Sequence, residues 1–137
     1  MRAAVPAADA AEAAIGAHAD SLAALEIGAL CHGDPKPDHL LVDAGRLAGV
    51  IDWGDAVVGD PLWDIARFSH RADARSISLL LAGYDPDGTL ADALAWRLPL
   101  YEALWMLVDA VIADRLLGRP IGALLEAAHH SLAQQPR

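Results

Sequence analysis

Four residues whose side chains suit metal binding and acid–base chemistry, His32, Asp34, His39 and Asp52, fall within one short stretch of the sequence. The stretch, CHGDPKPDHLLVDAGRLAGVIDWGDAVVGDPLWDIARF, covers residues 31–68. Taken singly, a histidine beside an apolar strand is more often structural, and an aspartate beside glycine or proline usually serves a turn. The combination is more informative, because two metal ligands beside a free carboxylate is an arrangement that metal-assisted chemistry needs.

The elements around these residues predict how they are positioned. Two apolar runs, HLLVD and RLAGVID, are joined around Ala44-Gly45. Gly45 can adopt the positive φ that a tight turn requires, so the pattern predicts a small antiparallel β-hairpin. A hairpin brings its ends together, and we therefore expect His39 and Asp52 to be neighbours.

The remainder of the chain has helical patterns. An amphipathic helix is expected from about Ala7 to Glu26, followed by a short buried strand in IGALCH. After the hairpin, Asp60 should cap a helix that has Pro61 at its first position. Further helices are expected at about 74–84, at 89–117 with Pro99 kinking or dividing it, and at 121–132. The fold class is therefore mainly α with a small β-hairpin, and we expect one domain over residues 1–137.

Composition narrows the classes of partner. The net charge is −9 and the one lysine is Lys36, which argues against a nucleic-acid partner because such binding relies on clustered Lys and Arg. No window holds the ~18 uninterrupted apolar residues of a membrane helix. A single cysteine, Cys31, cannot form an internal disulfide, which fits a reducing, cytoplasmic location. Acidity also suits a cationic small substrate, although it is equally typical of an ordinary protein surface.

The motifs resemble the aminoglycoside phosphotransferase family, a branch of the protein-kinase-like fold. In the kinase pattern, H-R-D-x-x-x-x-N supplies the catalytic Asp and a metal-binding Asn, and D-F-G supplies a second metal ligand. Here HGDPKPDH places His39 at the Asn spacing, IDW takes the place of D-F-G, and GDPLWDIA is similar to the family segment that leads into the next helix. The resemblance covers roughly residues 25–70 and implies the C-terminal lobe of that fold.

The resemblance also implies roles and ligands. Asp34 would be the catalytic aspartate that orients an acceptor hydroxyl, and His39 and Asp52 would hold Mg²⁺ against the phosphates of ATP or GTP. Lys36 would contact the transferring phosphate. The acceptor would be a hydroxyl of a small molecule, with a cationic antibiotic as one candidate. Structural roles are expected for His32, which would brace the loop, and for Asp64, which would anchor its backbone.

One part of the family pattern is missing from the sequence. Family members have an N-terminal nucleotide lobe with a phosphate-covering loop and a strand lysine, yet about thirty residues precede His32 and none of them is lysine. We therefore expect a truncated or half enzyme, with a partner chain as one source of the missing lobe. Two alternatives remain: a non-catalytic binding module, and a metal-dependent hydrolase with His32, Asp34, His39 and Asp52 around one ion.

Overall fold

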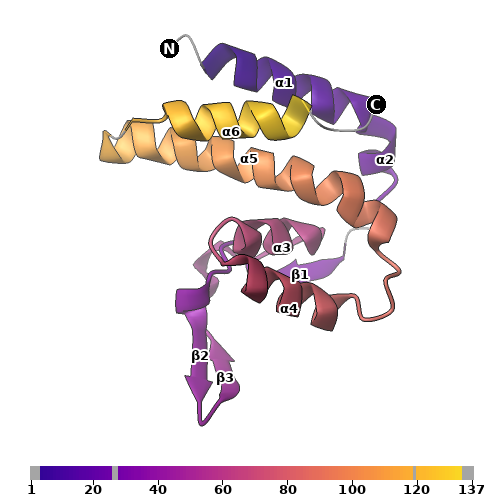
Figure 1. Cartoon of the computed structure of the whole chain (residues 1–137), viewed down its shortest axis with the longest axis vertical. Coiled ribbons are helices and arrows are strands. Elements are labelled where there is room, and N and C mark those ends of the chain that lie inside the picture. The colour runs from indigo at the N-terminus through magenta and orange to yellow at the C-terminus, as the bar shows by residue number, and fades with distance from the viewer. Residues whose placement is uncertain (1–3, 26–27, 119, 134–137) are drawn as a thin grey trace. The chain divides into compact units, whose positions relative to one another are not determined.

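A computed structural model describes residues 4–25, 28–118 and 120–133 (Figure 1). The protein is mainly helical, as the sequence predicted, and it has two small antiparallel sheets, one of which is the predicted hairpin. It forms two compact units, one made of Met1–Leu25 and Asp92–Arg137 and the other of Glu26–Ala91. The expectation of a single domain stays a prediction. Within the described residues, no helix has the length and apolar character needed to cross a bilayer.

The elements that the structure describes in the first unit are helices: α1 (Ala4–Ala17), α2 (Ala19–Ala23), α5 (Ala91–Leu117) and α6 (Gly122–Ala133). The single helix expected from Ala7 to Glu26 is broken at His18, and Glu26 itself lies outside the described residues. Helix α1 packs along α6 (Figure 1). The buried side chains of α1 and α6 include those of Ala11, Ala14 and Ala128, whose small size lets two helix axes approach closely.

Of the two effects expected of Pro99, a kink or a division, division of the helix does not occur: α5 is one helix with this proline inside it. A proline removes one backbone hydrogen bond, and tertiary packing offsets that loss here: the next residue, Leu100, is fully buried. The Pro99 carbonyl also accepts a hydrogen bond of 3.5 Å from the Ser131 hydroxyl of α6. Gly118 ends the helix at a φ of 58°, as the sequence predicted.

The second unit contains the four strands found in the part of the chain that the structure describes. The predicted hairpin is β2 (Leu40–Asp43) paired with β3 (Arg46–Val50). Ala44 and Gly45 both have positive φ, 48° and 78°, which is the type I′ turn that suits the twist of a two-residue hairpin. The strand expected in IGALCH is β1 (Ala29–Cys31), but it is not buried as expected: Cys31 is buried, whereas Leu30 is 68% exposed, and Ile27 lies outside the described residues. It pairs antiparallel with β4 (Val57–Gly59), which the sequence analysis did not predict.

Two helices complete this unit, α3 (Leu62–Ser69) and α4 (Ala74–Tyr84). Helix α3 begins one residue later than expected, because Pro61 and not Asp60 is the N-cap. Asp60 precedes the N-cap, and its Oδ1 accepts a 3.0 Å hydrogen bond from Leu62 N–H. Helix α3 is the buried element of the unit, with five of its residues buried: Leu62, Ile65, Ala66, Arg67 and Phe68. One of these five carries a charge, which bears on the site described next.

Candidate active site

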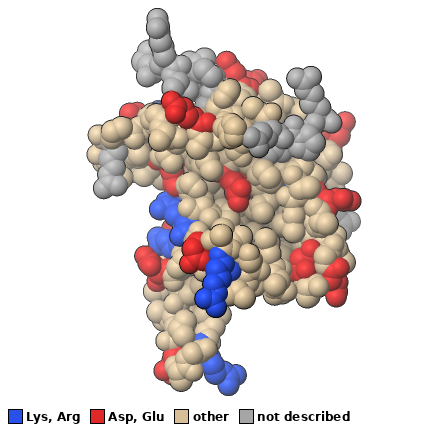
Figure 2. Space-filling view, viewed as in Figure 1, with Lys and Arg blue, Asp and Glu red and all other residues tan. Residues whose placement is uncertain are grey.

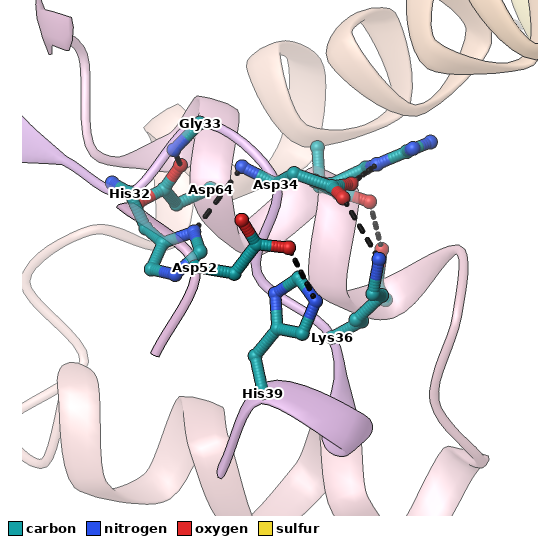
Figure 3. A network of polar contacts seen from close by, with 10 residues as sticks. His32, Gly33, Asp34, Lys36, His39, Asp52 and Asp64 are labelled. Carbon is teal, nitrogen blue, oxygen red and sulfur yellow. Dashed lines mark hydrogen bonds and ion pairs between the residues drawn. The ribbon is translucent and has the colours of Figure 1, made fainter. Parts of the chain in front are cut away.

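The loop between β1 and the short helix at Pro37–His39 carries three of the predicted site residues (Figure 3). Its backbone is bound by the carboxylate of Asp64, from α3. Asp64 Oδ2 accepts from His32 N–H at 2.5 Å, and Oδ1 accepts from Gly33 N–H at 2.9 Å. The predicted anchoring role of Asp64 is therefore confirmed.

Gly33 allows this loop to pass against the segment that follows the hairpin. Its φ is 87°, and a Cβ at this position would lie 2.0 Å from the backbone oxygen of Asp55. Two features therefore disfavour a side chain at this position: the left-handed backbone conformation, and the short distance to the backbone of Asp55. The glycine of HGD is required so that the loop and the IDWGD segment can lie in contact.

Asp34 is held by two cations. Arg67 Nε, from α3, lies 2.6 Å from Asp34 Oδ1, and Lys36 Nζ lies 3.1 Å from Oδ2. Burial raises the pKa of Asp34, but the hydrogen bonds and charges of Arg67 and Lys36 outweigh it and hold the pKa below the ordinary aspartate value. The carboxylate is therefore ionised at neutral pH, which is the form that can accept a proton.

His39 and Asp52 are neighbours, as the hairpin predicted, with His39 Nε2 and Asp52 Oδ2 3.2 Å apart (Figure 3). His39 is buried at the start of β2, whereas the Asp52 side chain is 65% exposed. Asp52 has a φ of 65°, a left-handed conformation that is costly outside glycine and is often found at functional sites. The described part of the molecule thus presents a nitrogen and a carboxylate ligand together, beside solvent.

His32 joins the two loops that carry these groups. Its Nε2 lies 2.7 Å from the carbonyl oxygen of Ile51, and its Nδ1 lies 3.3 Å from the backbone nitrogen of Asp34. A carbonyl only accepts and a backbone N–H only donates, so the proton of the ring belongs on Nε2. The bracing role expected for His32 is thus supported by one hydrogen bond to each loop.

Large aromatic side chains are mostly buried, but Trp53, in the position that follows Asp52, is an exception. It is 46% exposed, although its ring lies 4.7 Å from the ring of His32. The indole Nε1–H donates to the carbonyl of Val50 at 2.8 Å, so the polar edge of the side chain is satisfied at the surface.

Comparison with known proteins assigns the family. The sequence model of the phosphotransferase enzyme family, APH, matches residues 2–97, which is more than half of the chain. The chain belongs to the phosphotransferase enzyme family. The resemblance drawn from the motifs is confirmed, and the match extends it to the N-terminal helices.

Among curated proteins, the phosphotransferase-family chain is 38% identical over 60 residues to the uncharacterized protein YcbJ of Bacillus subtilis (strain 168). That match covers 43% of this chain and 20% of YcbJ, so the chain matches about a fifth of the length of this relative. No solved structure matches the chain.

Of the four sequence-predicted residues, His39 and Asp52 have side chains within ion-pair distance of each other, whereas the side chains of His32 and Asp34 are bound by other groups. Both ring nitrogens of His32 have backbone partners, and both oxygens of Asp34 have cationic partners. No group of three or more metal-ligating side chains converges within the described ranges. The four-ligand arrangement of the hydrolase alternative is therefore not formed, and His39 with Asp52 is the pair left for a cation.

Arg67 is the residue of this family member's site that the sequence analysis missed. The signal was weak: an arginine within the apolar pattern of α3, three positions after Asp64 and so on the same side of the helix. A charged side chain is rarely buried unless it is paired, and its partner here is 33 positions earlier in the chain.

Proposed function

We propose that this chain carries the catalytic and metal-binding loops of a nucleotide-dependent phosphotransferase, which moves the γ-phosphoryl group of ATP or GTP to a hydroxyl of a small molecule. One observation carries the proposal: His39 and Asp52 are paired at 3.2 Å, while the two carboxylate oxygens of Asp34 are bound by Arg67 and Lys36. This division into a ligand pair and a separate ionised acid is what the kinase pattern requires.

In this proposal Asp34 orients the acceptor hydroxyl and accepts its proton as transfer proceeds. The transition state of phosphoryl transfer is loose and rich in charge, so catalysis depends mostly on positioning and on electrostatic stabilisation. Asp34 meets both needs, because its backbone N–H contacts His32 and its carboxylate is fixed and ionised.

The residues present fit Mg²⁺ in part. His39 Nε2 and Asp52 Oδ2 can ligate one cation together once Nε2 carries no proton, and Mg²⁺ commonly uses one or two protein ligands with phosphates and waters. Imidazole is softer than the oxygen ligands that Mg²⁺ prefers. His39 and Asp52 would hold the ion, which would offset the negative charge of the nucleotide phosphates.

We infer that the remaining nucleotide contacts come from outside these 137 residues. Lys36 is the one lysine of the sequence, and it lies beside Asp34, where it suits the transferring phosphate. A strand lysine of the family type is therefore not available within the chain. We propose that the chain acts as the C-terminal lobe of a kinase-like fold, and that an N-terminal lobe is supplied by further sequence or by a partner chain.

The acceptor is proposed only as a class, a small molecule with a reactive hydroxyl. The net charge of −9 would suit a cationic antibiotic. However, the acidic side chains are spread over the face seen in Figure 2 rather than gathered in one patch. Charge therefore gives no reason to prefer aminoglycosides over macrolides or metabolite alcohols.

The test separates transfer from binding by using two variants. Asp34→Asn should lower the rate of transfer far more than it weakens nucleotide binding, because it removes the proton acceptor. Asp52→Ala should instead weaken binding of the metal–nucleotide complex, because it removes a charge from the cation. Asp43→Asn, at the exposed end of β2, is the control and should leave both quantities unchanged.

The assay is ATP and GTP turnover with aminoglycosides, macrolides and simple alcohols, for the chain alone and with an N-terminal lobe added. We expect no nucleotide turnover from the chain alone, and turnover once the N-terminal lobe has been added. Equal effects of the Asp34 and Asp52 variants on rate and on binding would contradict the assigned roles. Nucleotide binding without any transfer would favour a binding module.

A further inference from the structure

Helix α3 contacts three consecutive residues of the candidate catalytic loop through two of its own side chains, one turn apart. Asp64 binds the backbone N–H groups of His32 and Gly33, and Arg67 binds the carboxylate of Asp34. A helix is a rigid support, so both the path of the loop and the direction of the Asp34 side chain are set by one element.

The two oxygens of Asp34 have partners of different character. Oδ1 is bound at 2.6 Å by Arg67, whose side chain is 7% exposed and fixed within α3. Oδ2 is bound at 3.1 Å by Lys36, whose side chain is 33% exposed and extends from the loop itself. The arginine contact is thus shorter and more buried. The lysine is one-third exposed and has a flexible stem, so its ammonium group can move to a phosphate.

We propose that Arg67 is a positioning residue, which holds Asp34 Oδ1 so that Oδ2 is the oxygen presented to the acceptor hydroxyl. The transfer step of this inference rests on the proposed function. In that step the acceptor oxygen forms a bond to the γ-phosphorus of the nucleoside triphosphate and its proton passes to Asp34 Oδ2. The bond from the γ-phosphorus to the bridging oxygen breaks, and the nucleoside diphosphate leaves.

Arginine suits this role for two physical reasons. It stays charged, so it favours the ionised carboxylate at any pH at which the protein is folded. Its planar guanidinium also fixes the direction of the hydrogen bond, which a lysine ammonium does not. A hydrogen bond to one oxygen restricts rotation of the Asp34 carboxylate about its Cβ–Cγ bond, so the other oxygen keeps its position. That position matters because misplacement of a catalytic group by ~1 Å can cost about 100-fold in rate.

The first experiment needs no acceptor. The Asp34 carboxyl is titrated by carbon-13 NMR in the full chain for wild type, Arg67→Met, Arg67→Lys and the control Arg46→Met, which removes an equal charge from the exposed hairpin end. We expect the midpoint pH of the Asp34 titration to be higher in Arg67→Met than in wild type, intermediate in Arg67→Lys and unchanged in Arg46→Met. If Arg67→Met does not fold, the comparison of Arg67→Lys with wild type is the test. An Asp34 midpoint equal to that of wild type, in whichever Arg67 variant folds, overturns the inference.

The second experiment uses the acceptors that wild type turns over with the added lobe. In Arg67→Met, kcat should fall about tenfold or more while the KM for nucleotide changes less than about threefold. The acidic limb of the pH–rate profile should move to higher pH. An unchanged kcat, or a loss explained by KM alone, overturns the inference. If no acceptor is turned over, that failure counts against the proposed function, and the carboxyl titration alone decides the role of Arg67.

Discussion

Replacement of Gly33 by alanine should damage the candidate site more than any other single methyl group added to the hairpin region. The left-handed φ of 87° costs an alanine roughly 1–2 kcal/mol. The new Cβ would also lie 2.0 Å from the backbone oxygen of Asp55, so the backbone has to move. Overpacking of this kind typically costs about 1–3 kcal/mol, which gives a total loss of about 2–5 kcal/mol in the free energy of unfolding.

Gly45 provides the matched control. Its φ of 78° is close to that of Gly33, but a Cβ there meets nothing within 4 Å. Gly45→Ala should therefore show the backbone cost of about 1–2 kcal/mol alone. Urea unfolding measures both variants, and hydrogen exchange at the amides of His32 and Gly33 locates the loss. Equal destabilisation by the two variants would refute the argument that close contact with Asp55 makes Gly33 necessary.

Two further predictions concern the contacts of the loop with α3. Asp64→Ala leaves the backbone N–H groups of His32 and Gly33 without their charged acceptor, so the free energy of unfolding, measured in urea, should fall by about 2–3 kcal/mol. A loss below about 0.5 kcal/mol would show that other acceptors can replace the Asp64 carboxylate. The pKa of Asp34 is lower in the folded protein than its ordinary value of 3.8, so its stabilising contribution is complete above that value and is lost as the pH falls through the folded pKa. The stability difference between wild type and Asp34→Asn should accordingly be constant from about pH 6 to 8 and shrink below about pH 4. If the stability difference instead became larger as the pH falls, the lowered pKa of Asp34 in the folded protein would be contradicted.

The sequence predicted the local elements well, because their signals are local. The hairpin followed from two apolar runs and Gly45, and helix α4 was placed at its observed bounds by the turn residues after Tyr84. The meeting of His39 and Asp52 followed from the hairpin alone. Each of these inferences needed only residues that lie close together in the chain.

Contacts between residues that are far apart in the sequence were less predictable. Pairing of β1 with β4 joins residues nearly thirty positions apart, and the only signal was the pair Val57-Val58. The ion pair between Asp34 and Arg67 joins residues 33 apart, and sequence alone does not specify which buried charge meets which. Tertiary context also overrode two local rules, at the exposed Trp53 and at Pro99 inside a continuous helix.

The candidate site lies in the unit that is continuous in sequence, and this has a consequence for the order of folding. Glu26–Ala91 is complete once residue 91 has been made, whereas the other unit must bring Met1–Leu25 together with Asp92–Arg137 across that whole intervening segment. Loop closure becomes less favourable with length, although only slowly, and chain synthesis proceeds from the N-terminus. We expect the segment that carries the chemistry to acquire structure first during synthesis, so that the helices at the two ends of the chain assemble after the site has formed. Pulsed hydrogen exchange on chains stalled near residue 91 would show protection of the His32 and Gly33 amides if this order is correct, and none if the site waits for the C-terminal helices.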